Sequence, residues 1–108
     1  MSIKLLEHIH EELKSAGFVS SIPEFCNAWL GRSEGYIRTL RYHDLDPSVA
    51  VLSVCSHKLG HYAQRLRDSS KAEYEATAQS FEQLKQLCEQ AIAKQSQAIW
   101  KQPQRMGA

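Results

Sequence analysis

Several features that define large classes of proteins are missing from this chain of 108 residues. It has no run of about 18 apolar residues, so no segment is expected to span a membrane. Residues 1–14 mix acidic with apolar side chains, unlike a signal peptide, and we therefore expect a cytoplasmic protein. Cysteine is scarce as well. The three present, Cys26, Cys55 and Cys88, are odd in number and scattered, which predicts reduced core thiols rather than a disulfide framework or a zinc site.

The chain has almost no excess of charge of either sign. Thirteen basic and twelve acidic side chains leave a formal net charge of +1. Residues 1–19 carry 2 basic and 3 acidic side chains, residues 20–67 carry 6 and 4, and residues 68–108 carry 5 and 5. The small basic surplus therefore lies in the central segment. It is weak support for nucleic-acid binding, and it implies poor non-specific affinity for DNA unless a dimer doubles the basic surface.

The sequence also lacks the motifs of active sites. No nucleophile–base pairing, phosphate-cradling glycine loop or paired carboxylates stand out, so we expect neither an enzyme nor a bound cofactor. His57 and His61 are spaced to share a helix face, but no third ligand lies at helical spacing from both, and no metal site is expected. His8 and His10 lie two residues apart and cannot share a face, so solvated side chains are expected there.

Apolar residues recur at helical spacing along the whole chain. Residues 2–14 predict an amphipathic first helix that ends near Gly17. A second helix is expected over residues 21–29, because Ser21 is a good N-cap and Glu24 three residues later completes a capping box.

The central segment predicts a short helix that follows the second one closely. Gly31 can adopt the left-handed conformation of a tight turn, and Leu30 can fill the space between the two helices. Ser33 is the expected N-cap of a helix reaching Tyr42, with a polar and partly basic outer face. The sequence from Asp46 to Ser48 then ends this helix and starts another, which continues to about Arg67.

Residues 71–100 contain neither glycine nor proline and are rich in Ala, Glu, Gln and Lys, which predicts one long helix. Its apolar positions approximate the spacing of a coiled-coil seam. A helix of about 45 Å is too long to be covered by its own small domain, so we expect a homodimer. The residues expected at the dimer interface are Tyr74, Phe81, Leu84, Cys88, Ile92 and Ile99. The alternative is a long helix folded back on its own domain.

Together these patterns predict an all-α fold of four to five helices. A helix-turn-helix domain over residues 1–67 is followed by the long helix over residues 68–100 and by a flexible tail over residues 101–108. The expected core residues are Leu6, Ile9, Leu13, Phe25, Leu30, Ile37, Leu40, Leu52 and Leu59.

Residues 30–60 resemble the Cro/cI-type, lambda-repressor-like helix-turn-helix family. The residues that carry the resemblance are Leu30-Gly31-x-Ser33, then Ile37 and Leu40, then Pro47-Ser48, then Leu52, and finally Leu59-Gly60. They keep the spacing of the family without an insertion. The resemblance implies a lambda-repressor-like domain that acts as a sequence-specific transcriptional regulator and binds a palindromic operator in double-stranded DNA as a homodimer.

The resemblance also implies that the helix from Ser33 to Tyr42 enters the major groove. The residues expected to read base edges are Arg38 and, around it, Ser33, Glu34, Gly35 and Thr39, while Arg32, Arg41 and the helix terminus at Ser21 contact phosphates. Arg38 could instead be a solvated or phosphate-bound charge. The alternative for the whole chain is a protein-interaction module that keeps the scaffold without binding DNA, which the low net charge and Glu34 favour slightly.

Overall fold

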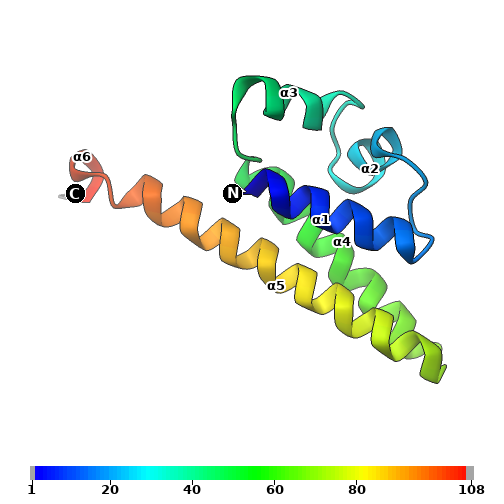
Figure 1. The fold of residues 1–108 in the computed structure, drawn as a ribbon. Coiled ribbons are helices and arrows are strands. Elements are labelled where there is room, and N and C mark those ends of the chain that lie inside the picture. The colour runs from blue at the N-terminus through cyan, green and yellow to red at the C-terminus, as the bar shows by residue number, and fades with distance from the viewer. Residues whose placement is uncertain (1, 107–108) are drawn as a thin grey trace.

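Helices account for all the regular structure in residues 2–106, the part of the chain that this computed structural model describes. The elements are α1 (Ser2–Ser15), α2 (Ile22–Trp29), α3 (Tyr36–His43), α4 (Val49–Asp68), α5 (Ala72–Trp100) and the single turn α6 (Pro103–Met106). Figure 1 shows α1, α2 and α3 stacked on one side of a hairpin formed by α4 and α5. The predicted all-α fold with a long C-terminal helix is confirmed.

The connection between α1 and α2 follows the sequence signals with one change. Gly17 has φ +81°, and the backbone N–H of Phe18 donates to the carbonyl of Leu13 at 2.8 Å, which closes the end of α1. Ser21 caps α2, because its hydroxyl accepts a hydrogen bond from the N–H of Glu24 at 3.3 Å. The Glu24 carboxylate reaches back one residue further than in a standard capping box, to the N–H of Ser20 at 2.6 Å.

The start of α3 differs from the expectation. Gly35 is the N-cap residue and makes no side-chain capping hydrogen bond, so the predicted cap at Ser33 is wrong. Residues 31–35 are used to carry the chain away from α2, and Ser33 contributes only its carbonyl, which accepts from the N–H of Tyr36 at 3.1 Å. The helix ends at His43 and is capped by Asp44, which has φ +52° and donates its N–H to the carbonyl of Arg41.

The hairpin of α4 and α5 is tied at both ends. At the turn, Arg67 donates to Glu75 at 3.3 Å and also pairs with Glu82; the hydrogen bond to Glu82 raises the pKa of Arg67. Near the other end, the side-chain amide of Gln95 donates to the carbonyl of Pro47 at 2.8 Å. Because α5 has 29 residues and α4 has 20, the end of α5 extends beyond its partner, as Figure 1 shows.

The apolar seam of α5 packs within the same chain, against α4 and, at Phe81, against the rings of Phe18 and Trp29. Phe81, Leu84 and Cys88 are at most 2% exposed, so assigning them to a dimer interface is wrong: a second copy cannot reach them while the hairpin is closed. The alternative of a helix folded back on its own domain is confirmed. Ile92 is half-buried against the same core and Tyr74 is half-buried, whereas Ile99, past the hairpin, is 51% exposed.

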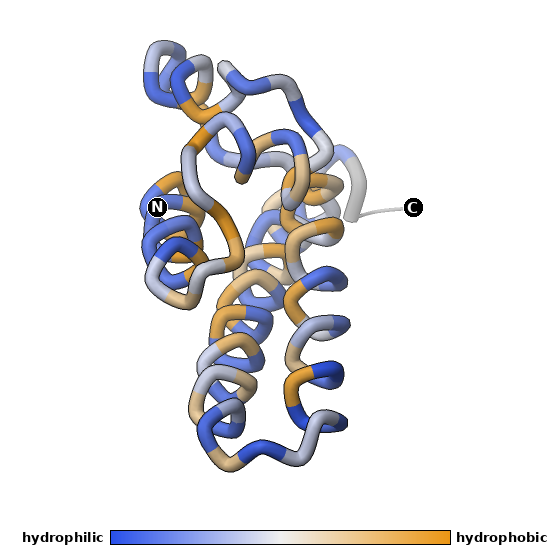
Figure 2. Tube along the Cα trace, turned by 90° about the vertical axis from the view of Figure 1, so that its right-hand side faces the viewer, coloured by the Kyte–Doolittle hydropathy of each residue, from blue (hydrophilic) through white to orange (hydrophobic). Residues whose placement is uncertain are grey.

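All nine predicted core residues are buried. Figure 2 shows apolar positions recurring along both helices of the hairpin. The three cysteines are free and buried, as expected. A hydrogen bond with Cys88, together with burial, raises the pKa of the Cys55 thiol. The expectation of a solvated side chain at His10 is wrong, since this residue is 6% exposed and its ring packs 5.6 Å from that of Phe25, where α1 meets α2.

Part of the predicted flexible tail is helical. After α5 the chain turns through residues 101–102 into α6, while residues 107–108 of the predicted flexible tail lie outside the described residues. Over the described part of the chain, no helix combines the length and the apolar character that crossing a bilayer requires.

Candidate nucleic-acid interface

The turn between α2 and α3 is tight. Gly31 has φ +65°, the left-handed conformation that the sequence predicted for it. The N–H of Arg32 donates to the carbonyl of Cys26 at 2.9 Å, which folds the chain back over the end of α2. Leu30 is 1% exposed and fills the space between the two helices, as expected. These contacts fix the direction in which α3 leaves the turn.

Helix α3 is attached to the rest of the molecule along one face only. Ile37 and Leu40 are its buried residues, whereas Arg38 and Thr39 are exposed and Tyr42 is 84% exposed. In Figure 1 this helix lies along an edge of the molecule, on the side away from the α4–α5 hairpin. Its outer face is therefore open to a large partner.

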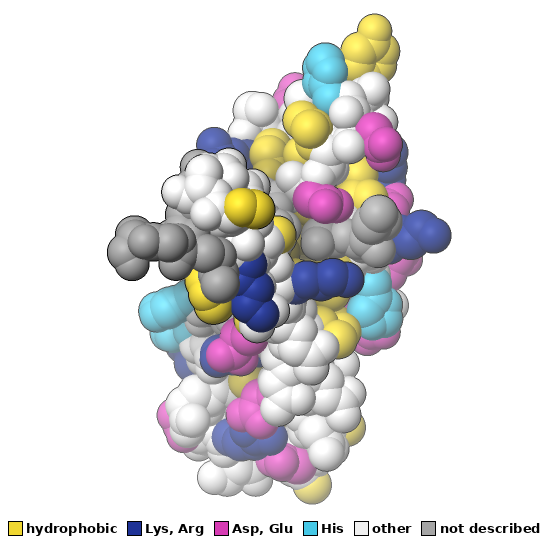
Figure 3. All heavy atoms as spheres, turned by 90° about the vertical axis from the view of Figure 1, so that its left-hand side faces the viewer, with side chains coloured by type: hydrophobic (Ala, Val, Ile, Leu, Met, Phe, Trp, Pro, Cys, Tyr) yellow, Lys and Arg dark blue, Asp and Glu magenta, His cyan; other side chains and the backbone are white. Residues whose placement is uncertain are grey.

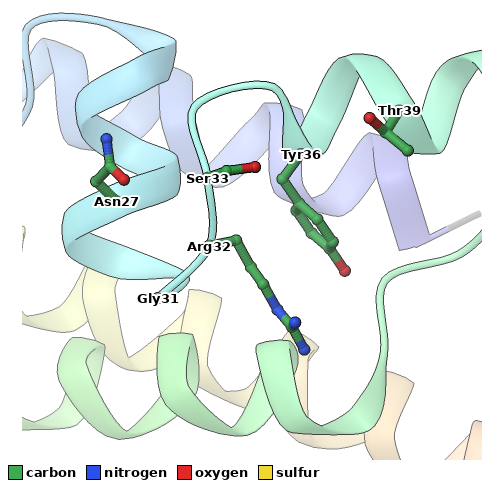
Figure 4. A pocket seen from close by; sticks show the side chains of 6 residues that line it. All are labelled: Asn27, Gly31, Arg32, Ser33, Tyr36 and Thr39. Atoms are coloured by element: carbon green, nitrogen blue, oxygen red, sulfur yellow. The ribbon is translucent and has the colours of Figure 1, made fainter.

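An open hollow of about 690 Å³ lies between the end of α2, the turn and α3 (Figure 4). The residues that line it are Asn27, Gly31, Arg32, Ser33, Tyr36 and Thr39. The Arg32 guanidinium lies 5.6 Å from the centre of the Tyr36 ring, and Figure 4 shows both side chains extending toward α4. The Tyr36 hydroxyl accepts from the backbone N–H of Ser48 at 3.4 Å, at the start of α4. The hollow thus combines a cation with amide and hydroxyl groups.

Arg38 lies at the beginning of α3. A Cβ atom added to Gly35 would lie 3.2 Å from the Nη2 atom of Arg38, so the guanidinium folds back over the first turn of the helix. Glu34, just before that turn, is exposed. The predicted base-reading residues are thus gathered around the N-terminal end of α3, and one of them, Glu34, carries a carboxylate.

Two of the three residues expected to contact phosphates, Arg41 and Ser21, do not line the hollow. Arg41 forms an ion pair with Glu7 of α1, so its guanidinium is already engaged. Ser21 is half-buried, and its hydroxyl is used to cap α2. The predicted residues that line the hollow are Arg32, Ser33 and Thr39.

Sequence reasoning missed two residues of the hollow. Asn27 is exposed on α2, four residues before Gly31, and faces the turn. The signal for it was a polar residue on an otherwise apolar stretch of α2. Tyr36 shares the helical spacing of Leu40, which is typical of an apolar core position, but it is half-buried and its hydroxyl reaches the residue that caps α4. An amphipathic side chain of this kind can do both.

The two histidines that are spaced to share a helix face lie on α4, away from the hollow. His57 and His61 are both exposed on α4. Within residues 2–106, no group of three or more His, Cys, Asp or Glu side chains is placed to hold a metal ion.

Comparison with protein-family models gives a match to DUF6626, a family of unknown function, over residues 6–101. The chain belongs to the DUF6626 family. The matched residues include all of α2, α3 and α4 and reach one residue past the end of α5, so the hairpin and the open face of α3 both belong to the family region. Comparisons with curated proteins and with solved structures found no match.

Proposed function

We propose that the chain is a sequence-specific, non-enzymatic transcriptional regulator that places α3 in the major groove of double-stranded DNA. The observation that carries the proposal is the outer face of α3: a helix that follows a tight turn, is held by two buried residues and presents its polar side to solvent. A major groove about 12 Å wide admits a helix presented in this way. The similarity of residues 30–60 to Cro/cI-type proteins supports the same reading.

In this proposal Arg38 is the main base-reading residue. Its guanidinium lies over the first turn of α3, and the N-terminal residues of a recognition helix are the ones that contact base edges. A guanidinium in that position can donate two hydrogen bonds to the O6 and N7 atoms of a guanine. Glu34 can accept from the amino group of a cytosine, which would offset the repulsion between its carboxylate and the phosphates. Ser33, Gly35 and Thr39 complete the surface.

The hollow beside the turn is proposed to receive a backbone phosphate. Arg32 supplies a cation that is already oriented by the Tyr36 ring, and Asn27 and Ser33 supply neutral donors from α2 and the turn. Charge-assisted hydrogen bonds of this type are short and strong. Phosphate contacts fix the register of a protein on the duplex, while the base contacts provide the sequence preference.

A protein-interaction module without DNA binding is the second candidate. The net charge of +1 is low for a nucleic-acid-binding chain. Near the end of α3, Tyr42 is 84% exposed and Leu45 is 52% exposed, and exposed apolar groups close together often mark protein contacts. In this alternative the same edge of the molecule binds a protein rather than DNA.

The two candidates separate in a binding-site selection from random duplex DNA. We expect the wild-type protein to enrich one palindromic motif, because a homodimer presents two copies of α3. An Arg38→Ala variant should lose preference at one base pair of each half-site, whereas Arg65→Ala, an exposed arginine near the far end of α4, should enrich the wild-type motif. Failure of the wild-type protein to enrich any motif would favour the interaction module.

A further inference from the structure

Helix α5 carries a second stripe, of three apolar residues and one lysine, besides the apolar seam that is buried within its own chain. Leu87, Ala91, Lys94 and Ala98 follow one another at intervals of four, three and four residues, which is the spacing of a helix–helix contact. They line a groove of about 530 Å³ on the C-terminal half of α5, together with Leu5 of α1 and other side chains. Leu87 is 40% exposed, and Lys94 and Ala98 are exposed. Apart from Ala91, which is half-buried against the core, this stripe is uncovered, and it lies on a helix that also extends beyond its hairpin partner.

We propose that a second copy of the chain covers this groove, with the two α5 helices packed antiparallel across a two-fold axis. The positions of the stripe are symmetric about a point between Ile92 and Ala93. A two-fold axis there places Leu87 opposite the partner's Ala98, and Ala91 opposite the partner's Lys94. A large side chain then meets a small one at each end, and alanine lets two helix axes approach to about 8 Å.

The charges in the groove also suit a second copy. Asp46 and Lys94 both line it, and neither belongs to an ion pair among the described residues. An interface related by a two-fold axis brings each surface against itself, so a patch of one sign would repel its own copy. Here each copy supplies one carboxylate and one ammonium group. The proposed arrangement pairs Asp46 with the partner's Lys94, twice.

The end of α5 that extends beyond α4 gives a further reason to expect a second copy of the chain in this groove. Helix α5 has nine more residues than α4, which corresponds to about 13 Å of helix. A short helical segment gains little stability without tertiary contacts. Figure 3 looks onto this end of the molecule and shows apolar side chains interspersed with both signs of charge. An antiparallel partner helix would cover both overhanging ends at once.

This inference deepens the proposed function, and it rests on that function where it concerns binding to a palindromic operator. The dimer itself is measured without DNA. The test is sedimentation of the full chain over a concentration series. Ala98→Arg places a bulky cation in the interface and should weaken the dimer at least about tenfold. Ala93→Arg makes the same substitution at an exposed position on the side of α5 away from the groove and should leave dimerisation unchanged. Both positions are exposed, and thermal melts should confirm that both variants fold.

The antiparallel register is tested by exchanging large and small residues. Leu87→Ala leaves two small residues opposite each other and should weaken the dimer. Combining it with Ala98→Leu restores a large residue opposite a small one, so the double variant should recover most of the lost affinity. A monomeric wild-type chain, or an Ala98→Arg variant that dimerises like wild type, would overturn the proposal. A double variant no stronger than Leu87→Ala would overturn the register. None of these outcomes depends on DNA, so a failed dimer and a failed DNA-binding function are told apart.

Discussion

Arg41 on α3 and Glu7 on α1, 34 residues apart in sequence, form an ion pair that joins the two helices. The two side chains are 50% and 43% exposed. The pair lies on the inner side of α3, near its C-terminal end, and fastens that end to α1. Arg41 therefore acts in the structure as a support of α3, a role that differs from the phosphate contact expected from sequence.

Removing either partner of this pair should have a small effect on stability. Arg41→Ala and Glu7→Ala are each expected to lower the free energy of unfolding by about 0.2–1 kcal/mol, the range for exposed ion pairs. Because the two residues share one interaction, the double variant should lose less than the sum of the single variants. Urea denaturation of all four proteins measures this coupling. Strictly additive losses would show that the pair does not form in solution.

Lys58 should stabilise the end of α2. Its ammonium group donates to the carbonyl of Ala28 at 2.6 Å and lies 4.9 Å from the centre of the Trp29 ring. Lys58→Met keeps most of the apolar stem and removes both interactions, so we expect a loss of about 1–2 kcal/mol. Lys14→Met, at an exposed position of α1, is the matched control and should be nearly neutral. Equal melting temperatures for the two variants would contradict this role of Lys58.

His10 is a buried polar residue whose replacement should stabilise the protein. Its Nε2 atom is buried and has no hydrogen-bond partner among the described residues. A buried polar atom in this state costs about 1–3 kcal/mol, whereas an apolar side chain of similar size has no such cost. His10→Leu is therefore expected to raise the free energy of unfolding by about 1 kcal/mol. A clear loss of stability instead would mean that Nε2 binds a partner in solution.

The raised pKa of the Cys55 thiol predicts that the free energy of unfolding declines at alkaline pH. A hydrogen bond with Cys88, together with burial, raises the pKa of Cys55 above that of an unfolded cysteine, which is about 8.5. A raised pKa means that its contribution is fully present below about pH 8.5 and is lost as the pH rises toward the pKa of the folded state. The same hydrogen bond lowers the pKa of Cys88, whose contribution changes with pH in the opposite sense, so the comparison is made without that thiol. Urea denaturation between about pH 7 and pH 10 should show a steeper decline for Cys88→Ala, in which burial still raises the pKa of Cys55, than for the Cys55→Ala/Cys88→Ala double variant. Identical pH dependence would exclude this contribution.

The sequence predicted the helices better than the contacts between them. Periodicity and caps located α1, α2, α4 and α5 because these signals are local, as at Ser21 and Ser48, whose hydroxyls cap helices in the structure. The partner of α5 could not be predicted this way. Phe81 and Leu84 would form the same apolar stripe against α4 or against another chain, and only the tertiary arrangement distinguishes the two.

The candidate site was predicted to a similar extent. Arg32, Ser33 and Thr39 line the hollow because their positions depend on the local turn and helix. The ion pair of Arg41 could not be predicted because its partner, Glu7, comes from a distant helix. Asn27 was missed because its role depends on how α2 is oriented toward α3. The sequence therefore could not predict side-chain roles that depend on packing between elements.

The most direct test of the central claim, that α3 reads base edges, is the affinity of wild type and variants for a selected duplex and for a scrambled one, measured by fluorescence anisotropy over a range of salt concentrations. Arg38→Ala should lose about 1–3 kcal/mol on the selected duplex and little on the scrambled one. Arg32→Ala should weaken binding to both duplexes alike and reduce the salt slope by about one, because one phosphate is then no longer neutralised. An Arg38→Ala variant that keeps the wild-type ratio of the two affinities, or a wild-type chain without salt-dependent binding, would contradict the claim.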